Sequence, residues 1–245
     1  MMKSLLIGLG IFLFTFSAGA GTFLETFDDG ELGEWQELVF FGAEVPGPWK
    51  IVDGELQFLL NQDDGGLTRL LTIGDELWQD YDIEFDVRPL KKHGIGNIAI
   101  AARIKGTWGV VCTIGDLPMP EPESMVRCFG GNLYGHAFLH FEKKHHRLLT
   151  VRPLKARGWH HMKLSVHGNL LTFWINGKQV LEPIVLKAIG PFPNYPNGKV
   201  GFGVSNYSAV FDNVTITGEG IPNHGGLSVT PRERLTTTWA SLRRF

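Results

Sequence analysis

The segment 134–142 carries residue types that could perform acid–base chemistry or bind a ligand. Alternate side chains of a β-strand share a face, so we expect Tyr134, His136, Phe138, His140 and Glu142 on one side of a strand. There His140 could accept a proton with Glu142 nearby, and the aromatic side chains could contact a sugar. A metal site is a less favoured interpretation, because the spacing indicates no third ligand. The plain alternative is a partly covered polar strand.

Two further strands could supply ligand contacts. In segment 97–104 we expect Ile104 to face the core with Ile98 and Ile100. The opposite face then has small alanines flanked by Asn97 and Arg103, which leaves room and donors for hydroxyl or carboxylate groups. On the strand 170–175, Trp174 faces away from the core and could stack on a sugar ring, unless a loop buries it. The expected ligand contacts are Arg103, Arg127, His136, His140 and Trp174.

Alternating hydrophobic residues and turn signals predict an all-β chain. The segments 158–166, 170–175 and 178–182 are joined by Gly-Asn and Asn-Gly, which is the signature of a three-stranded meander. About a dozen such segments occur, and no stretch of ten residues shows a convincing helical period. We therefore expect two antiparallel sheets packed face to face as a jelly-roll sandwich.

The two cysteines, Cys112 and Cys128, lie on expected strands around a proline-rich loop, 115–124. Their midpoint is Pro120, the middle of that loop, so a hairpin would set them opposite each other. This predicts a structural disulfide in an oxidising compartment. Two unpaired thiols on separate strands are the alternative.

The first 20 residues are typical of a secretory signal peptide. Lys3 precedes an apolar run, 5–16, and Ala18 and Ala20 form a cleavage site. An uncleaved anchor is the alternative, although the run is short for a membrane span. We expect a secreted protein, extracellular or periplasmic, with no membrane span after cleavage, a domain over 21–217 and an extended tail over 218–245. A short helix could form at 239–244.

The 245-residue chain has a formal net charge of −2, which argues against a nucleic-acid partner. Its charge balance also indicates no polybasic surface that would favour membrane binding. The sequence contains no phosphate-binding glycine loop.

Several segments together resemble the concanavalin A-like lectin and glucanase sandwich, and more closely its laminin G-like and 3-keto-disaccharide hydrolase branch. The resemblance covers about residues 23–216 and rests mainly on turn and core residues. The segments that carry it are 27–30 with Trp35, 49–56, 78–89, 158–160, Gly168-Asn169, 176–178, 198–202 and 211–214. It implies carbohydrate or glycoconjugate recognition on a concave sheet, and in some relatives cleavage of a glycosidic bond.

The resemblance implies two further sites and excludes one mechanism. A 3-keto group acidifies the neighbouring C2 hydrogen, which His140 or Glu142 could remove while Arg103 or a cation stabilises the enolate. Structural Ca²⁺ is expected at Asp28 and Asp212, unless these carboxylates only cap backbone amides. The two-glutamate mechanism of laminarinase-type relatives is not expected, because Pro89 stands where the second glutamate would be. Glu84 and Asp86 are instead expected on a solvated strand face.

Three functions stay open at this point. The first is a secreted module that binds carbohydrate on its concave sheet. The second is an enzyme that cleaves 3-keto-glycosides, and the third is an adhesion module that engages a partner through residues 218–245.

Overall fold

The computed structural model describes residues 20–40, 46–117, 123–134, 138–140, 146–148, 154–188 and 194–223. These residues form antiparallel strands and contain no α-helix. Consequently, within these ranges nothing helical is long and apolar enough to cross a membrane.

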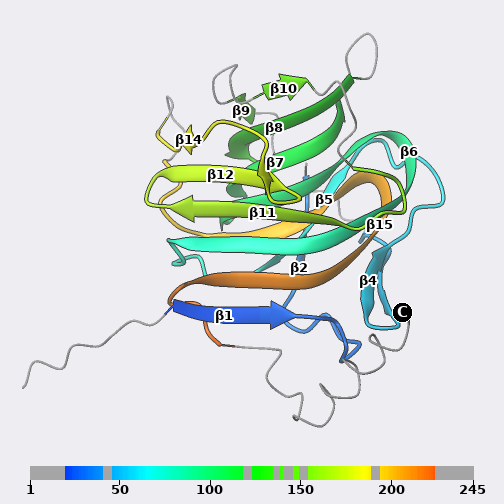
Figure 1. The fold of residues 1–245 in the computed structure, drawn as a ribbon, viewed down its shortest axis with the longest axis horizontal. Helices are drawn as coiled ribbons and strands as arrows, with labels where there is room; N and C mark the ends of the chain where they lie inside the picture. The colour runs from blue at the N-terminus through cyan, green and yellow to red at the C-terminus, as the bar shows by residue number, and fades with distance from the viewer. Residues whose placement is uncertain are drawn as a thin grey trace, which may run out of the picture.

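The strands, labelled in Figure 1, are β1 (Ala20–Glu25), β2 (Gln36–Val39), β3 (Trp49–Val52), β4 (Glu55–Phe58), β5 (Thr68–Ile73), β6 (Tyr81–Lys105), β7 (Trp108–Leu117), β8 (Glu123–Asn132), β9 (Phe138–His140), β10 (His146–Leu148), β11 (His160–His167), β12 (Leu170–Ile175), β13 (Lys178–Gln179), β14 (Ile184–Val185) and β15 (Lys199–Glu219).

Two long strands, β6 and β15, run through both layers of the sandwich (Figure 1). Residues 97–105 of β6 and 199–205 of β15 form the middle of what we call the first sheet, in the order β2-β5-β15-β6-β7-β8. The second sheet has the order β1-β15-β6-β11-β12 and uses residues 81–87 of β6 and 214–219 of β15. The expected all-β, two-sheet antiparallel fold is confirmed.

The bend between the two layers is built from small and amide side chains. At Gly96 a Cβ atom would lie 2.1 Å from the carbonyl oxygen of Ser205, so the close approach of β6 and β15 requires glycine there. Across from it, Asn206 adopts a left-handed φ of 51°, which asparagine tolerates better than most residues. Its side-chain amide donates to the carbonyl oxygen of Ile95 at 2.9 Å and fixes the bend.

The core between the sheets follows the predicted alternation. Ile83, Phe85 and Val87 of β6 are fully buried, while the residues between them are partly exposed. Phe202 packs against Phe85 and Phe211 with ring centroids 5.0 and 4.9 Å apart. These rings belong to the large hydrophobic core between the sheets, and burial of such apolar surface is the dominant favourable term in folding.

The meander is also confirmed. β11 and β12 pair in register around a turn at Gly168, whose φ is 57°. β12 turns into β13 at Asn176 and Gly177, with φ of 51° and 72°. Two successive positive φ values define the type I′ turn that the Asn-Gly pair predicts.

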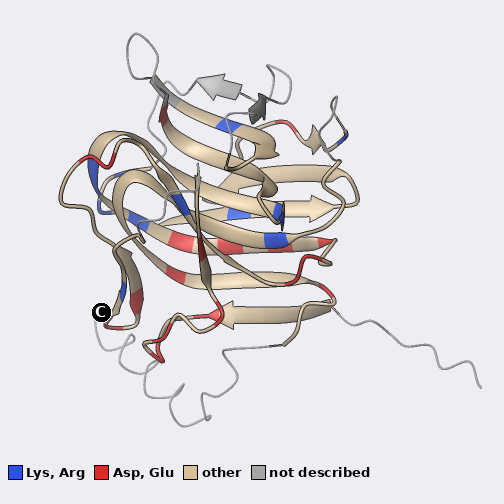
Figure 2. Cartoon of the chain, turned by 180° about the vertical axis from the view of Figure 1, so that it is seen from behind, with Lys and Arg blue, Asp and Glu red and all other residues tan. Residues whose placement is uncertain are grey.

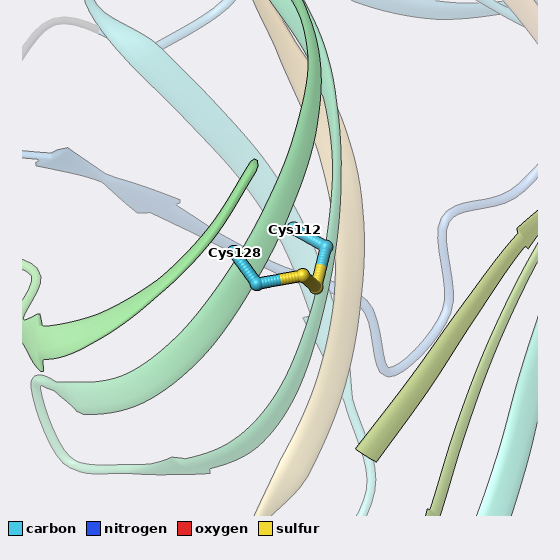
Figure 3. Close-up of a disulfide and its surroundings, with 2 residues drawn as sticks. All are labelled: Cys112 and Cys128. Carbon is cyan, nitrogen blue, oxygen red and sulfur yellow. A yellow bond between two sulfur atoms is a disulfide. The ribbon is translucent and has the colours of Figure 1, made fainter. Parts of the chain in front are cut away.

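The disulfide joins the expected cysteines (Figure 3). Cys112 of β7 lies directly opposite Cys128 of β8, with Cα atoms 4.0 Å apart. The hairpin symmetry about Pro120 therefore gave the correct register, and both cysteines face the core between the sheets.

The predicted assignment of side chains to the two faces of segment 97–104 is wrong at its end. Ile104 was expected with Ile98 and Ile100, but it packs with Ala99 and Ala101 on the opposite face of the first sheet. The reason is a β-bulge before Lys105, where the residue at 103 adopts a left-handed φ of 54° and reverses the order of the faces.

The strand pairing extends slightly beyond the expected domain. Residues 218 and 219 still pair with β1, and Ile221 belongs to the core, so the tail starts later than residue 218. The expected signal peptide, apart from Ala20, and the expected helix at 239–244 lie outside the described residues.

Candidate functional site

A pocket of about 570 Å³ lies on the outer face of the first sheet. Its walls come from β5 to β8, from β15 and from the loop before β5. The lining residues are Phe40, Asp63, Gly65, Gly66, Thr68, Ile95, Gly96, Asn97, Thr113, Asp116, Arg127, Phe129, Ser205 and Asn206.

The floor of the pocket is formed by polar residues that face each other across the strands. Thr113 of β7 is paired with Arg127 of β8, and Asn97 of β6 is paired with Ser205 of β15. Ser205 is in turn paired with Thr68 of β5. Because directly opposed residues of antiparallel strands share a face, these donors and acceptors converge on one space.

Two phenylalanines form an apolar wall beside this polar floor. The rings of Phe40 and Phe129 meet edge to face, with centroids 6.5 Å apart and planes at 90°. The guanidinium of Arg127 lies 5.1 Å from the centroid of Phe129. An aromatic wall beside hydrogen-bonding groups suits a ligand with apolar C–H faces and many hydroxyls.

The charged groups at the pocket differ in how they are compensated. Arg127 is half-buried, and burial lowers its pKa. Among the residues that the structure describes, no carboxylate forms an ion pair with it. By contrast, Asp116 is almost completely buried and pairs with Lys92. Arg127 is therefore the cation that a ligand could address.

The amide of Asn97 also has unused hydrogen-bonding capacity. Its Oδ1 atom is buried and has no donor within the described part of the chain. A buried acceptor without a donor costs free energy.

The rim of the pocket is held by side chains at the bend of β15. Asn206 accepts a hydrogen bond from the backbone of Asp64 at 3.0 Å, and Ser205 donates to the carbonyl oxygen of Gly66 at 2.8 Å. Asp63 accepts from the backbone N–H of Gly65 at 2.8 Å. The rim loop is therefore fixed by at least three hydrogen bonds.

Three of the expected ligand contacts, Arg103, Arg127 and Trp174, have described side chains, and the structure does not bring these three together. Of these three, only Arg127 lines the pocket. Trp174 lies on β12 of the second sheet, partly buried and paired with Lys163 and Gln179, and so belongs to a different surface. The expectation of one shared surface for Arg103, Arg127 and Trp174 is therefore corrected.

Arg103 lies inside the protein, with a side chain only 1% exposed. Its guanidinium donates to the carbonyl oxygens of Tyr195 at 2.8 Å, Gly168 at 3.0 Å and Pro196. Asp80 lies 3.6 Å away. The bulge turns this side chain away from the face of Ala99 and Ala101, so Arg103 ties loops together and does not reach the pocket.

The expected acid–base residues fall largely outside the described part. His136 and Glu142 lie outside it, and of His140 only the backbone is described. That backbone pairs β9 with β8, placing residue 140 opposite Phe129, a pocket residue. The catalytic role of His140 and Glu142 stays a prediction.

The polar side chains of β6 and β11 in the second sheet contact each other, and Figure 2 marks where Lys, Arg, Asp and Glu lie along the strands. Lys163 lies 2.8 Å from Asp82 and 3.4 Å from Glu84. His161 lies 3.0 Å from Asp86. Although burial acts to raise the pKa of Asp82, hydrogen bonds, first from Lys163, lower it overall. Glu84 and Asp86 thus belong to a partly exposed network of polar contacts, consistent with the expected strand face.

The acidic residues expected to bind calcium are electrostatically coupled. Burial raises the pKa of Asp212, the hydrogen bond from the backbone of Asn213 opposes this, and the charges of Asp28, Asp86 and Glu55 raise it further. Within the described ranges no group of three or more His, Cys, Asp or Glu residues is arranged to hold a metal ion. Calcium at Asp28 and Asp212 stays a prediction, and it would need backbone carbonyl oxygens or water as further ligands.

Reasoning from the sequence missed most of the pocket. Asn97 was expected to offer a donor to a ligand beside Arg103, but it was not among the expected contacts, and Thr113, Asp116 and Phe129 were not singled out. Thr113 lies one residue from Cys112 and could have been found through the hairpin register, since it is opposite Arg127.

Comparison with known proteins supports the same architecture. A family model described as a 3-keto-alpha-glucoside-1,2-lyase-like domain matches residues 22–217. No curated protein sequence matches the chain.

Three solved structures with the same fold come from proteins with different descriptions. The CBM2 module of an evolved Dit protein from Lactobacillus casei BL23 phage J-1 has a TM-score of 0.56 at 11% identity, covering 82% of this chain and 97% of its own. A structure reported for endo-acting O-glycanases of the human gut microbiota has a TM-score of 0.54 at 12% identity, covering 79% and 97%. A Bacillus licheniformis β-glucanase has a TM-score of 0.50 at 15% identity, covering 81% and 98%. At these identities the likeness shows the fold alone.

Proposed function

Because the chain belongs to the family of 3-keto-alpha-glucoside-1,2-lyase-like domains, we propose that it binds a carbohydrate in the pocket of the first sheet. The observation that carries this proposal is the convergence of hydrogen-bonding side chains beside an aromatic wall within about 570 Å³. This volume falls within the range of small-molecule sites, roughly 300 to 1,000 Å³. The relatives in fold include a carbohydrate-binding module and a glucanase, which agrees with a sugar ligand.

The test is glycan binding to the secreted form of the chain, with two matched substitutions. Thr113→Val removes a hydroxyl from the pocket floor at nearly constant shape. Thr172→Val makes the same change on the outer face of the second sheet. We expect saturable binding to at least one glycan, weakened about two- to tenfold by the first substitution and unchanged by the second.

Substitution at Trp174 decides between the two faces. If Trp174→Ala abolished glycan binding and Thr113→Val left it intact, the ligand would lie on the second sheet. The absence of binding across a broad glycan panel would end the proposal.

The second candidate function is elimination at a 3-keto-glycoside, and two observations favour it: the family match and the position of β9 beside the pocket. A base, for which His140 is the candidate, takes the C2 proton, and the electron pair forms an enolate across C2 and C3. Reformation of the C3 ketone then drives a C1–C2 double bond and expels the glycosidic oxygen, which takes up a proton. Arg127 is placed better than Arg103 to stabilise the enolate oxygen, because only Arg127 lines the pocket.

Turnover of a 3-keto-disaccharide tests this second function. Free sugar should be released by the wild-type protein and not by a folded His140→Ala variant. Binding without turnover across several 3-keto-glycosides would leave the binding function alone.

Secretion belongs to the same proposal. The disulfide between Cys112 and Cys128 suits an oxidising compartment. Mass spectrometry of the protein from its own host should find an amino terminus near Gly21 and a fraction outside the cytoplasm. A full-length reduced chain in the cytoplasm would contradict it.

A further inference from the structure

We propose that the ligand of the pocket carries a carboxylate, as in a uronic acid, that pairs with Arg127. This inference rests on the proposed carbohydrate-binding function and specifies its substrate class. It follows from one half-buried cation that the rest of the described pocket does not neutralise.

Arg127 remains charged at all physiological pH values, because a guanidinium does not deprotonate in proteins. Its partner among the described residues is the ring of Phe129, 5.1 Å from the guanidinium carbon. A cation–π contact stabilises by about 0.5–2 kcal/mol, less than the cost of taking a charge out of water. An anionic ligand would supply the missing compensation.

The acidic residues of the same pocket are engaged elsewhere. Asp116 pairs with Lys92. Asp64 lies 3.6 Å from Arg69, and Asp63 accepts the backbone N–H of Gly65 at the rim. None of them is shown forming an ion pair with the guanidinium, so within the described part of the chain its charge has no carboxylate partner.

The strand register separates the two ends of the pocket. Thr113, opposite Arg127, is three residues from Asp116 along β7, which corresponds to about 10 Å. A sugar ring can therefore place an acidic group at Arg127 while its other side stays away from Asp116.

The neighbouring groups suit a carboxylate on a sugar ring. A guanidinium presents paired N–H groups that match the two oxygens of a carboxylate. The hydroxyl of Thr113 across the strand pair can donate to the same group. A sulfate ester would present similar oxygens, so the experiment includes both.

The experiment is calorimetric titration of the wild-type protein with methyl α-D-glucuronide, the neutral methyl α-D-glucoside and its 6-sulfate. The variants are Arg127→Gln, which removes the positive charge, and Arg127→Lys, which keeps the charge but lacks the paired N–H groups of the guanidinium. Lys178→Gln, at an exposed position of β13, is the control for loss of one positive charge. Thermal melting of each variant shows whether it is folded.

We expect the glucuronide to bind the wild-type protein about ten- to a hundredfold more tightly than the glucoside. Arg127→Gln should abolish this preference and leave affinity for the glucoside within about twofold. Arg127→Lys should keep part of the preference, and Lys178→Gln all of it. A higher affinity for the sulfate than for the glucuronide would overturn the assignment of a carboxylate.

Equal affinities of the wild-type protein for glucuronide and glucoside would also overturn the inference while leaving carbohydrate binding intact. So would a loss of affinity for both sugars alike in a folded Arg127→Gln variant. If no glycan of any charge bound, the proposed function itself would fail, and this inference with it.

Discussion

Replacing Arg103 by methionine should destabilise the protein strongly without touching the pocket. The guanidinium is buried and satisfies three backbone carbonyl oxygens, those of Gly168, Tyr195 and Pro196. Methionine fills a similar space but leaves these buried acceptors without donors. Each lost charge-assisted bond costs about 1.5–3 kcal/mol, and because such losses are not additive the total should be about 3–5 kcal/mol. Asp80 adds little, since its carboxylate is 48% exposed and keeps its water.

The assay is urea unfolding followed by tryptophan fluorescence, with Arg103→Lys as the matched variant. Lysine keeps the charge and can reach one or two of the carbonyls, so it should lose less stability than methionine. The left-handed backbone at this position is shared by all three side chains and cancels in the comparison. A loss below about 1 kcal/mol for methionine would refute the reasoning, because the carbonyls would then have other donors. Reduced glycan affinity in folded Arg103→Lys would restore Arg103 as a ligand contact.

Three further predictions concern the disulfide, a turn and the acidic pair. Replacing both Cys112 and Cys128 by serine should cost about 3 kcal/mol in urea unfolding, since the bridge closes a loop across a sequence separation of 16. Gly177→Ala should cost about 1 kcal/mol in the same assay, because φ is 72° there. Asp212 has a raised folded-state pKa, so stability falls as pH rises through and above its ordinary value of 3.8. Asp212→Asn should therefore raise the melting temperature at pH 7 and not at pH 3. If the wild-type protein binds calcium at Asp28 and Asp212, added Ca²⁺ should raise its melting temperature. No stabilisation by Ca²⁺ would end the calcium prediction.

The sequence was sufficient to predict the fold wherever a signal is local. Period-2 alternation identified the buried residues of segment 81–88, and the Asn-Gly pair at 176–177 specified its turn. The cysteines lie symmetrically about a loop and therefore gave the register of β7 and β8. Each of these inferences depends on a few neighbouring residues, and each is confirmed.

The continuity of the long strands could not be predicted in the same way. Segments 81–88 and 97–104 read as two strands because glycines interrupt the alternation between them, yet they form the single strand β6. Glycine is equally at home in a turn and in a bent strand. Only the pairing with β15, whose own bend lies at Asn206, decides between these possibilities, and that pairing joins residues far apart in the chain.

The same limit explains why Arg103 was misplaced. A β-bulge has no reliable signature when its left-handed residue is not glycine, and one extra residue exchanges the two faces. Ile104 then took the face that alternation had assigned to Arg103. Burial of an arginine also depends on carbonyl groups of distant loops, which no local pattern reveals.

The pocket, by contrast, follows from the register that the cysteines define. Cys112 and Cys128 face the core, so the residues next to them, Thr113 and Arg127, must face the other side of the same sheet. The disulfide therefore fixes the spacing of β7 and β8 at Cys112 and Cys128. Thr113 and Arg127, which belong to the pocket floor, lie one residue away. The outward neighbours of covalently linked core positions are thus fixed in space together with the core, and in this chain two of them, Thr113 and Arg127, line the pocket.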